Sequence, residues 1–240
     1  MSAIKLKVLA LIPARGGSRS IKLKNLKKIN NISLVGHSIN HALKSKLVDR
    51  VIVSSDNDKI IKETLKFGAE APFKRPKEIS RDDTLDFPVF EHCINWLKKN
   101  ENWEPDIIVH LRPTCPFRKK GWIDNCVKEL VNNEDAQAIR SVSLVKEHPY
   151  RMYEVNKKTN MLESYVKNVI APATLRRQDH PKLYHYNCVI DVTRLNTLKK
   201  VRSMTGDNLI GWFMNNDEVI DIDTQADLDY ARYFFKHNKI

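Results

Sequence analysis

Long apolar runs are missing from this sequence. Crossing a bilayer takes about 18 or more consecutive apolar residues, and none of the runs in the 240 residues comes near that length. The apolar run before Arg15 is also too short for a signal peptide. We therefore expect a cytoplasmic protein with no membrane partner.

Cysteine and glycine are scarce, which excludes further classes of protein. The four cysteines, Cys93, Cys115, Cys126 and Cys188, form no C-x-x-C pair and have no histidine at a zinc-ligand spacing. Neither a disulfide framework nor a structural zinc site is expected from such a pattern. Only seven glycines occur, and no low-complexity tract interrupts the chain. The composition is typical of one compact globular domain over residues 1–240.

Acidic residues are outnumbered by basic ones, and the formal net charge is +12. A nucleic-acid interface needs clustered cations interleaved with stacking aromatic residues. Here the lysines are spread over the polar positions of expected helices, which is typical of solvated helix faces. We expect no nucleic-acid partner, and a basic nucleic-acid-binding module stays open as an alternative.

Strand-like apolar runs alternate with amphipathic helical patterns along the first part of the chain. The expected strands cover residues 7–13, 50–56 and 106–111, and the expected helices cover residues 34–48, 57–68, 85–99 and 121–132. This alternation predicts a Rossmann-like α/β fold, with a mainly parallel sheet and helices on both faces. Ligands bind beyond the carboxyl ends of such strands, which points to residues 14–25, 54–56 and 112–118.

The alternation breaks down at about residues 141–192. β-Branched and aromatic residues there are interrupted by Pro149, Pro172 and Pro181. We expect an inserted, β-rich dimerisation arm that packs on another subunit. The later run around Asp221 is expected to be a short strand, followed by a final helix that Thr224 caps.

The loop after the first expected strand combines a bare backbone with positive charge. Gly16 and Gly17 let backbone N–H groups approach an anion closely, because no Cβ stands in the way. Arg15 and Lys24 are placed to neutralise phosphate charge. The loop matches neither the G-x-G-x-x-G nor the P-loop pattern, so by itself it remains open to interpretation as a plain turn.

Two aspartates near the end of the chain are the candidate metal ligands. Asp221 and Asp223 are two residues apart, so in a strand they share one face while Ile220 and Ile222 point toward the core. Side-by-side carboxylates suit Mg²⁺, which also takes phosphate oxygens and waters. The alternative is a pair of exposed or capping aspartates at a strand end.

Six stretches of the chain match a known family in order. "IPARGGSRSIKLKNL" resembles the N-terminal signature of the CMP-sialic acid synthetases, the acylneuraminate cytidylyltransferases and their CMP-ketodeoxyoctonate relatives. The other blocks are "VIVSSDNDKI", "KRPKEISRDDT", "LRPTCPFR", "LRRQDHPKLYHYNCVIDV" and "DIDTQADL". Together they extend over nearly the whole chain.

The resemblance implies a nucleotidyltransferase that serves cell-surface polysaccharide biosynthesis. Its substrates would be CTP and a 2-keto-3-deoxy acid sugar of the nonulosonic type, joined at the sugar's anomeric hydroxyl with release of pyrophosphate. It also implies Mg²⁺ as cofactor and a homodimer built with the arm. The same reaction on ketodeoxyoctonate is the alternative within enzymes.

Site residues follow from the loop chemistry and from the resemblance. Arg15 and Lys24, with Asp221 and Asp223, are the expected catalytic residues, and both aspartates are the expected metal ligands. The expected nucleotide contacts are Leu11, Ala14, Arg15, Gly16, Gly17, Ser18, Lys24, Asn25 and Arg75. Asn25 is expected to hold either the loop or the nucleotide. The acidic run from Asp82 is either a neighbour of the base or an acidic helix start.

The sugar side is implied by the resemblance alone. Its expected residues are Arg112, Arg177, Gln178, Tyr184 and Asn187, with Arg176 as an alternative to Arg177. Arg112 stands where the family often has Gln, and Cys188 replaces the usual Gly. These departures leave the acid open among sialic, legionaminic and pseudaminic types.

Overall fold

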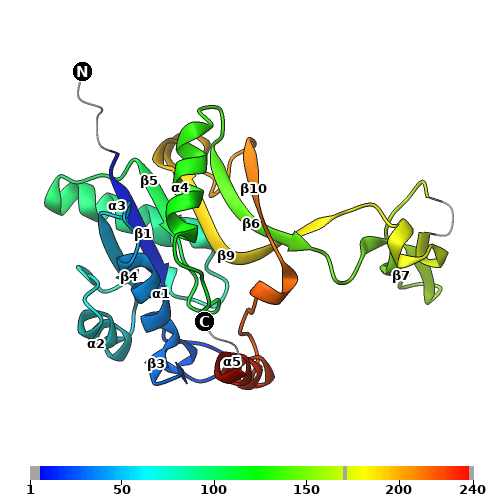
Figure 1. The fold of residues 1–240 in the computed structure, drawn as a ribbon, viewed down its shortest axis with the longest axis horizontal. Coiled ribbons are helices and arrows are strands. Elements are labelled where there is room, and N and C mark those ends of the chain that lie inside the picture. Colours follow the sequence, from blue (N-terminus) through cyan, green and yellow to red (C-terminus); the bar gives the residue numbers. More distant parts are fainter. Residues whose placement is uncertain (1–5, 170–171, 238–240) are drawn as a thin grey trace.

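The computed structural model describes residues 6–169 and 172–237, and six strands in it form one sheet (Figure 1). The strand order is β10, β6, β9, β5, β1, β4. Their bounds are β1 (Val8–Pro13), β4 (Arg50–Ser54), β5 (Ile107–His110), β6 (Ala138–Leu144), β9 (Tyr184–Arg194) and β10 (Leu209–Met214). Only β9 runs antiparallel to its neighbours. The prediction of a mainly parallel sheet is therefore confirmed.

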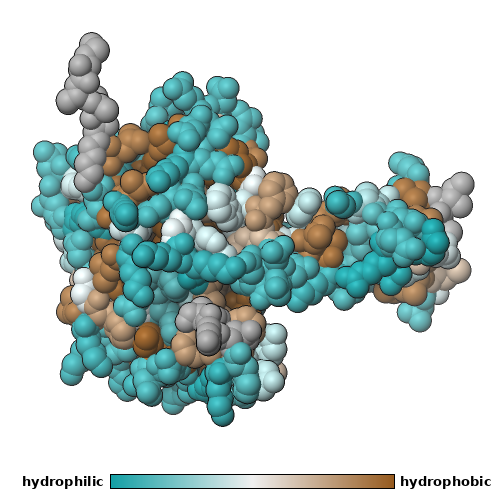
Figure 2. All heavy atoms as spheres, viewed as in Figure 1, coloured by the Kyte–Doolittle hydropathy of each residue, from teal (hydrophilic) through white to brown (hydrophobic). Residues whose placement is uncertain are grey.

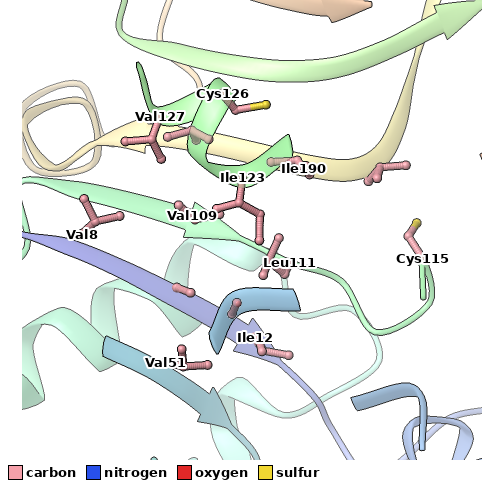
Figure 3. Close-up of a cluster of buried hydrophobic side chains, with 14 of the residues drawn as sticks. Val8, Ile12, Val51, Val109, Leu111, Cys115, Ile123, Cys126, Val127 and Ile190 are labelled. Atoms are coloured by element: carbon pink, nitrogen blue, oxygen red, sulfur yellow. The ribbon is translucent and has the colours of Figure 1, made fainter. Parts of the chain in front are cut away.

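Helices cover both faces of the sheet, as predicted. They are α1 (Leu34–Leu43), α2 (Asp58–Lys66), α3 (Asp86–Glu101) and α4 (Trp122–Asn132), whereas α5 (Gln225–His237) packs in a separate cluster with Ile29 and Leu34. Alternate residues of β1 point to opposite faces: Ala10 and Ile12 pack in the core with α1 and α4, whereas Leu9 and Leu11 pack with α3. Figure 3 shows Ile123 of α4 over the sheet in the first of these cores. None of the helices described is long and apolar enough to cross a membrane.

Short elements complete the chain. They are the hairpin β2 (Lys28–Ile29) and β3 (Ile32–Ser33), the single 3₁₀ turns η1 (Lys24–Leu26), η2 (Lys77–Ile79), η3 (Pro149–Arg151), η4 (Pro172–Thr174), η5 (Arg177–Asp179) and η7 (Asn216–Glu218), and the π turn η6 (Thr197–Val201). The four cysteines are free thiols.

Helix α1 ends at Leu43, five residues before the predicted end. The chain that follows is held by Asp124 of α4 instead. Its carboxylate accepts hydrogen bonds from the Ser45 hydroxyl and from the backbone N–H groups of Lys46 and Leu47. In a longer helix the N–H groups of Lys46 and Leu47 would donate to carbonyl oxygens four residues earlier. Here they donate to Asp124 instead, so a tertiary contact ends the helix early.

The predicted strand around Asp221 is wrong. Residues 219–223 form no strand or helix, and Ile222 N–H donates to Thr114 O at 2.9 Å. The predicted alternation holds, since Ile220 and Ile222 are buried with α5 while Asp221 and Asp223 are exposed. Thr224 caps α5 as predicted, because its hydroxyl accepts a hydrogen bond from Asp227 N–H at 3.3 Å.

An arm projects from the sheet over residues 145–183, carrying the hairpin β7 (Tyr153–Asn156) and β8 (Met161–Ser164) (Figure 1). The projecting part is shorter than the 141–192 segment expected, because both ends of that segment lie in β6 and β9 of the sheet. Apolar side chains are exposed along the arm (Figure 2). They include Tyr153, Val155, Met161, Leu162 and Tyr165.

Candidate active site

A cavity of about 570 Å³ lies beyond the carboxyl ends of β1, β4 and β5. One wall is the loop that follows β1, residues 14–25, which we call the glycine loop. The other walls come from the segment before α3, from the turn after β5 and from the segment before α5. The lining residues are Pro13, Arg15, Ser18, Arg19, Ser20, Lys24, Asn25, Arg75, Arg81, Asp82, Thr84, Leu85, Asp86, Val89, Arg112, Pro113, Thr114, Asp223 and Thr224. Four segments far apart in the sequence therefore meet where the strand-end rule places a ligand.

Positive charge predominates in this cavity, with six cationic side chains against three carboxylates. Each carboxylate is paired with a cation. Asp82 contacts Arg15, Asp86 Oδ2 lies 2.6 Å from Arg112 Nη2, and Asp223 Oδ1 lies 3.0 Å from Lys24 Nζ. A cavity of this charge suits a polyanionic ligand.

Lys24 joins the glycine loop to the segment before α5. Its Nζ donates to the Ile222 carbonyl oxygen at 2.8 Å and to Asp223 Oδ1 at 3.0 Å. The Ser20 hydroxyl donates to the Asp223 carbonyl oxygen. Residues almost 200 positions apart in sequence thus share one wall of the cavity.

The glycine loop is shaped by contacts behind it. A Cβ on Gly16 would lie 2.7 Å from Asn57 Nδ2, whereas a Cβ on Gly17 would meet nothing within 4 Å. Gly16 N–H already donates to Asp56 Oδ1 at 2.8 Å. Asn25 Nδ2 donates to Arg15 O at 2.9 Å, which helps to hold the loop. Asn25 also lines the cavity, so its contact with the nucleotide stays a prediction.

Arg75 is a buried cation at the back of the cavity, 5% exposed. Its Nε donates to Ser54 Oγ at 3.0 Å, and its Nη2 donates to the Ser54 carbonyl oxygen. Burial lowers the pKa of Arg75 to about 10, against the opposing effect of Asp56 and Asp86. Within the described ranges no carboxylate forms an ion pair with it. An anionic ligand would therefore relieve the cost of burying this charge.

Arg112 sits in a network of charged and aromatic groups. Its Nη1 donates to Asp191 Oδ2 at 2.9 Å and to the Tyr186 hydroxyl, while Nη2 donates to Asp86. Burial alone would lower the pKa of Arg112, but Asp191, Tyr186 and Asp86 outweigh it and raise the pKa. The Arg140 guanidinium lies over the Tyr186 ring, 4.1 Å from its centroid. Both Nη groups of Arg112 are thus engaged by the protein itself.

Asp221 lines a second cavity, of about 370 Å³, together with Ser143 and His185. The Cys115 thiol lies 3.6 Å from Asp221 Oδ1. The two aspartates predicted to hold one metal ion therefore face different cavities. Within residues 6–169 and 172–237, no group of three or more His, Cys, Asp and Glu side chains is placed to hold a metal ion.

A third cavity, of about 400 Å³, contains Arg177 and Gln178. It shares Val145, Lys146, Glu147 and Asn216 with the cavity that Asp221 lines. Arg176 pairs instead with Asp179 at 2.8 Å. Of the two adjacent arginines, Arg177 is the one that faces a cavity.

Comparison with known proteins decides the family. The model of a family described as "Cytidylyltransferase" matches residues 9–234. The chain belongs to the cytidylyltransferase family. It is therefore an enzyme of the nucleotidyltransferase class, and the alternative of a nucleic-acid-binding module is wrong.

Relatives of this cytidylyltransferase extend over almost its full length. It is 29% identical over 237 residues to a pseudaminic acid cytidylyltransferase of Campylobacter jejuni, covering 97% of this chain and 98% of the relative. It is 28% identical over 228 residues to a CMP-N,N'-diacetyllegionaminic acid synthase of the same species, covering 94% of each. A solved structure of CMP:2-keto-3-deoxy-manno-octonic acid synthetase complexed with CTP aligns with a TM-score of 0.69 at 17% identity, covering 96% of this chain and 98% of that one. At that identity the likeness shows the fold alone.

Several predicted site residues of the cytidylyltransferase lie outside the 570 Å³ cavity. Leu11 is fully buried in the core, and Ala14 is held by its N–H to Ser54 O at 2.9 Å. Tyr184 lies at the base of the arm, with its ring 4.7 Å from that of Phe213. Asn187 is 4% exposed, and its Oδ1 accepts a hydrogen bond from Val189 N–H at 3.3 Å. The Leu11 carbonyl oxygen also accepts from Leu111 N–H at 3.2 Å, so these groups of Leu11 and Ala14 are engaged within the sheet, and their contact with a base stays a prediction.

Sequence reasoning missed the carboxylates that hold the cavity's cations. Asp86 and Asp191 were not singled out, although both contact Arg112. Asp82 was expected beside the base or at a helix start, but α3 begins at Asp86 and Asp82 contacts Arg15 and Arg19. These pairs join distant segments, and no local pattern signals them.

Proposed function

We propose that this cytidylyltransferase transfers CMP from CTP to the anomeric hydroxyl of a nonulosonic acid and releases pyrophosphate. The observation that carries the proposal is the cationic cavity at the strand ends, where Lys24 links the glycine loop to Asp223. The names of the relatives support a nonulosonic acid as the acceptor. The proposed location is the cytoplasm, where CTP is available.

The triphosphate is proposed to bind between Arg15 and Lys24. Negative charge builds up on the transferred phosphoryl group and on the leaving pyrophosphate, so catalysis depends on cations already aimed at those oxygens. The backbone N–H group of Gly17 is proposed to add a donor, whereas the N–H groups of Gly16 and Ser18 already donate to Asp56 Oδ1 and Gly16 O. Arg75 supplies a further positive charge at the buried end of the cavity.

Mg²⁺ is the proposed cofactor, and the donor set suits it. When bound, it would screen charge on the phosphate oxygens. Mg²⁺ commonly binds through one or two carboxylates together with substrate phosphates and waters. Asp223 is exposed and lines the nucleotide cavity, so its carboxylate would provide one ligand. Asp221 is the second proposed ligand, and it would have to turn away from the Cys115 thiol to reach the same ion.

The acid sugar is proposed to bind on the arm side of the Asp221 segment. The two smaller cavities share lining residues, and together they extend from Asp221 to Arg177 and Gln178. A guanidinium group such as that of Arg177 pairs well with a sugar carboxylate. Arg112, Tyr184 and Asn187 remain proposed contacts of the sugar, although Arg112 lines the 570 Å³ cavity and none of the three lines the two smaller ones.

A homodimer is proposed, with the arm as the contact. The hairpin of β7 and β8 exposes apolar side chains, including Val155, 54% exposed, and Leu162, 63% exposed. A small hairpin of this kind is marginal without a partner surface. Light scattering should give twice the mass of the chain, and Leu162→Lys should shift it toward the monomer. A monomeric wild type would contradict the proposal.

The test of the proposed function is pyrophosphate release with Mg²⁺, each of the four nucleoside triphosphates and a panel of acid sugars. The panel contains N-acetylneuraminate, legionaminate, pseudaminate and ketodeoxyoctonate. We expect pyrophosphate release only when CTP and one of the nonulosonic acids are both present. Release with ketodeoxyoctonate alone would contradict the proposed substrate class, and release with another triphosphate in place of CTP would contradict the nucleotide.

A further inference from the structure

Asp82 bridges two arginines of the glycine loop across the mouth of the nucleotide cavity. It lies in a short turn in which Arg81 N–H donates to Thr84 Oγ1 at 3.1 Å. One carboxylate oxygen contacts Arg15 Nη1, and the other contacts Arg19 Nε. Asp82 and both arginines line the cavity. A single carboxylate thus holds two guanidinium groups that are 67 and 63 residues away.

A phosphate group could take the place of the Asp82 carboxylate between the two guanidinium groups. Guanidinium binds carboxylate and phosphate oxygens with the same donors and similar geometry. An anion entering between Arg15 and Arg19 therefore competes with Asp82 for the same N–H groups. The carboxylate would also repel a phosphate that approached while the ion pairs were closed.

We propose that Asp82 is an internal latch, which occupies Arg15 and Arg19 in the nucleotide-free enzyme and is displaced by the triphosphate of CTP. This inference rests on the proposed function. The latch makes triphosphate binding weaker than the arginines alone would allow. It also favours departure of pyrophosphate, because Asp82 takes back the two arginines as the product leaves.

Other features of the loop agree with this role. The Arg15 and Arg19 contacts lower the pKa of Asp82, as expected for a carboxylate that both arginines stabilise. The side chain of Arg19 is 80% exposed, so it can follow a ligand without disturbing the core. Three of the four remaining cations of the cavity, Lys24, Arg75 and Arg112, are held by partners other than Asp82.

The chain offers a matched control at the next residue. Asp83 carries the same charge in the same turn, but it is not among the described residues that line the cavity. Asp82→Asn and Asp83→Asn therefore change the net charge equally, and only the first removes the latch. Titration calorimetry of inorganic pyrophosphate and of CTP, each with Mg²⁺, compares the wild type with both variants.

We expect Asp82→Asn to bind pyrophosphate and CTP about three- to ten-fold more tightly than the wild type, a range set by two partly exposed ion pairs. Asp83→Asn should change either affinity less than two-fold. Binding by Asp82→Asn that equals or falls below that of Asp83→Asn would overturn the latch while leaving the proposed function intact. Absence of CTP binding in all three proteins would overturn both.

Discussion

Acidification gives a quantitative test of how the loop after β5 is supported. His41 on α1 lies beneath that loop, with its Nε2 3.1 Å from the Pro116 carbonyl oxygen. Burial, reinforced by the nearby Arg118, lowers the pKa of His41 from 6.5 to about 3. The ring is therefore neutral in the folded protein over most of the acidic range.

The sign and size of the effect follow from linkage. Above pH 6.5 the ring of His41 is neutral in both states and contributes no pH dependence. As the pH falls below that value, the unfolded chain takes up a proton that the folded chain does not bind, so stability is lost. Each pH unit removes about 1.4 kcal/mol, which amounts to about 2 kcal/mol at pH 5.

The matched variant is His41→Gln, whose side-chain amide can donate to Pro116 O but does not titrate. Urea unfolding at pH 7 and at pH 5 gives the free energy of unfolding of both proteins. We expect the wild type to lose about 2 kcal/mol more than the variant between the two values. His37 and Lys44 are present in both proteins, so the difference isolates His41. Equal losses in the two proteins would refute the reasoning.

Three further predictions concern the site. Arg15→Ala should lower turnover about 100- to 1000-fold with an unchanged circular dichroism spectrum, because a cation aimed at the triphosphate is lost; near-normal pyrophosphate release would count against it. Arg112→Met should reduce the free energy of unfolding, measured in urea, by about 3 kcal/mol, because the buried Asp191 carboxylate loses its arginine partner. Adding Asp191→Asn should restore more than half of that loss. A double variant as unstable as Arg112→Met would argue against the Arg112–Asp191 ion pair. Chelation by EDTA should abolish pyrophosphate release, and Asp223→Asn should raise the Mg²⁺ concentration needed for half-maximal rate, an unchanged requirement being the contrary result.

Much of the fold could be predicted from the sequence because its signals are local. The buried strand at Val8–Pro13 is a continuous apolar run, and the start of α2 is marked by Asn57, whose side chain accepts from Lys59 N–H. Gly68, at φ +82°, follows the same helix in the left-handed region, where glycine is the common residue at a helix end. These features depend on neighbours within one or two turns of the chain.

The direction of β9 could not be predicted in that way. An apolar run indicates a strand but not its orientation, which here depends on an arm that leaves after β6 and returns beside it. The return includes a register shift, where Ser141 Oγ accepts from the N–H groups of Val189 and Ile190. Cys188 lies in this bulge at φ +65°, a left-handed conformation that glycine adopts more readily than a residue with a side chain.

The basic residues of the candidate site could be predicted from the sequence, but the carboxylates that pair with them could not. Glycines and basic residues after the first strand are contiguous, so Arg15, Lys24 and Asn25 were identified, and all three line the cavity. Asp82 and Asp191 reach their partners only through the folded chain. Local sequence contains no record of such pairs.

A crystal structure with CTP and Mg²⁺ is the most direct test of the central claim, that the glycine loop and the segment before α5 act on one triphosphate. We expect phosphates in contact with Arg15 and Lys24, and a metal ion bound to Asp223. A triphosphate bound away from these three side chains would contradict it.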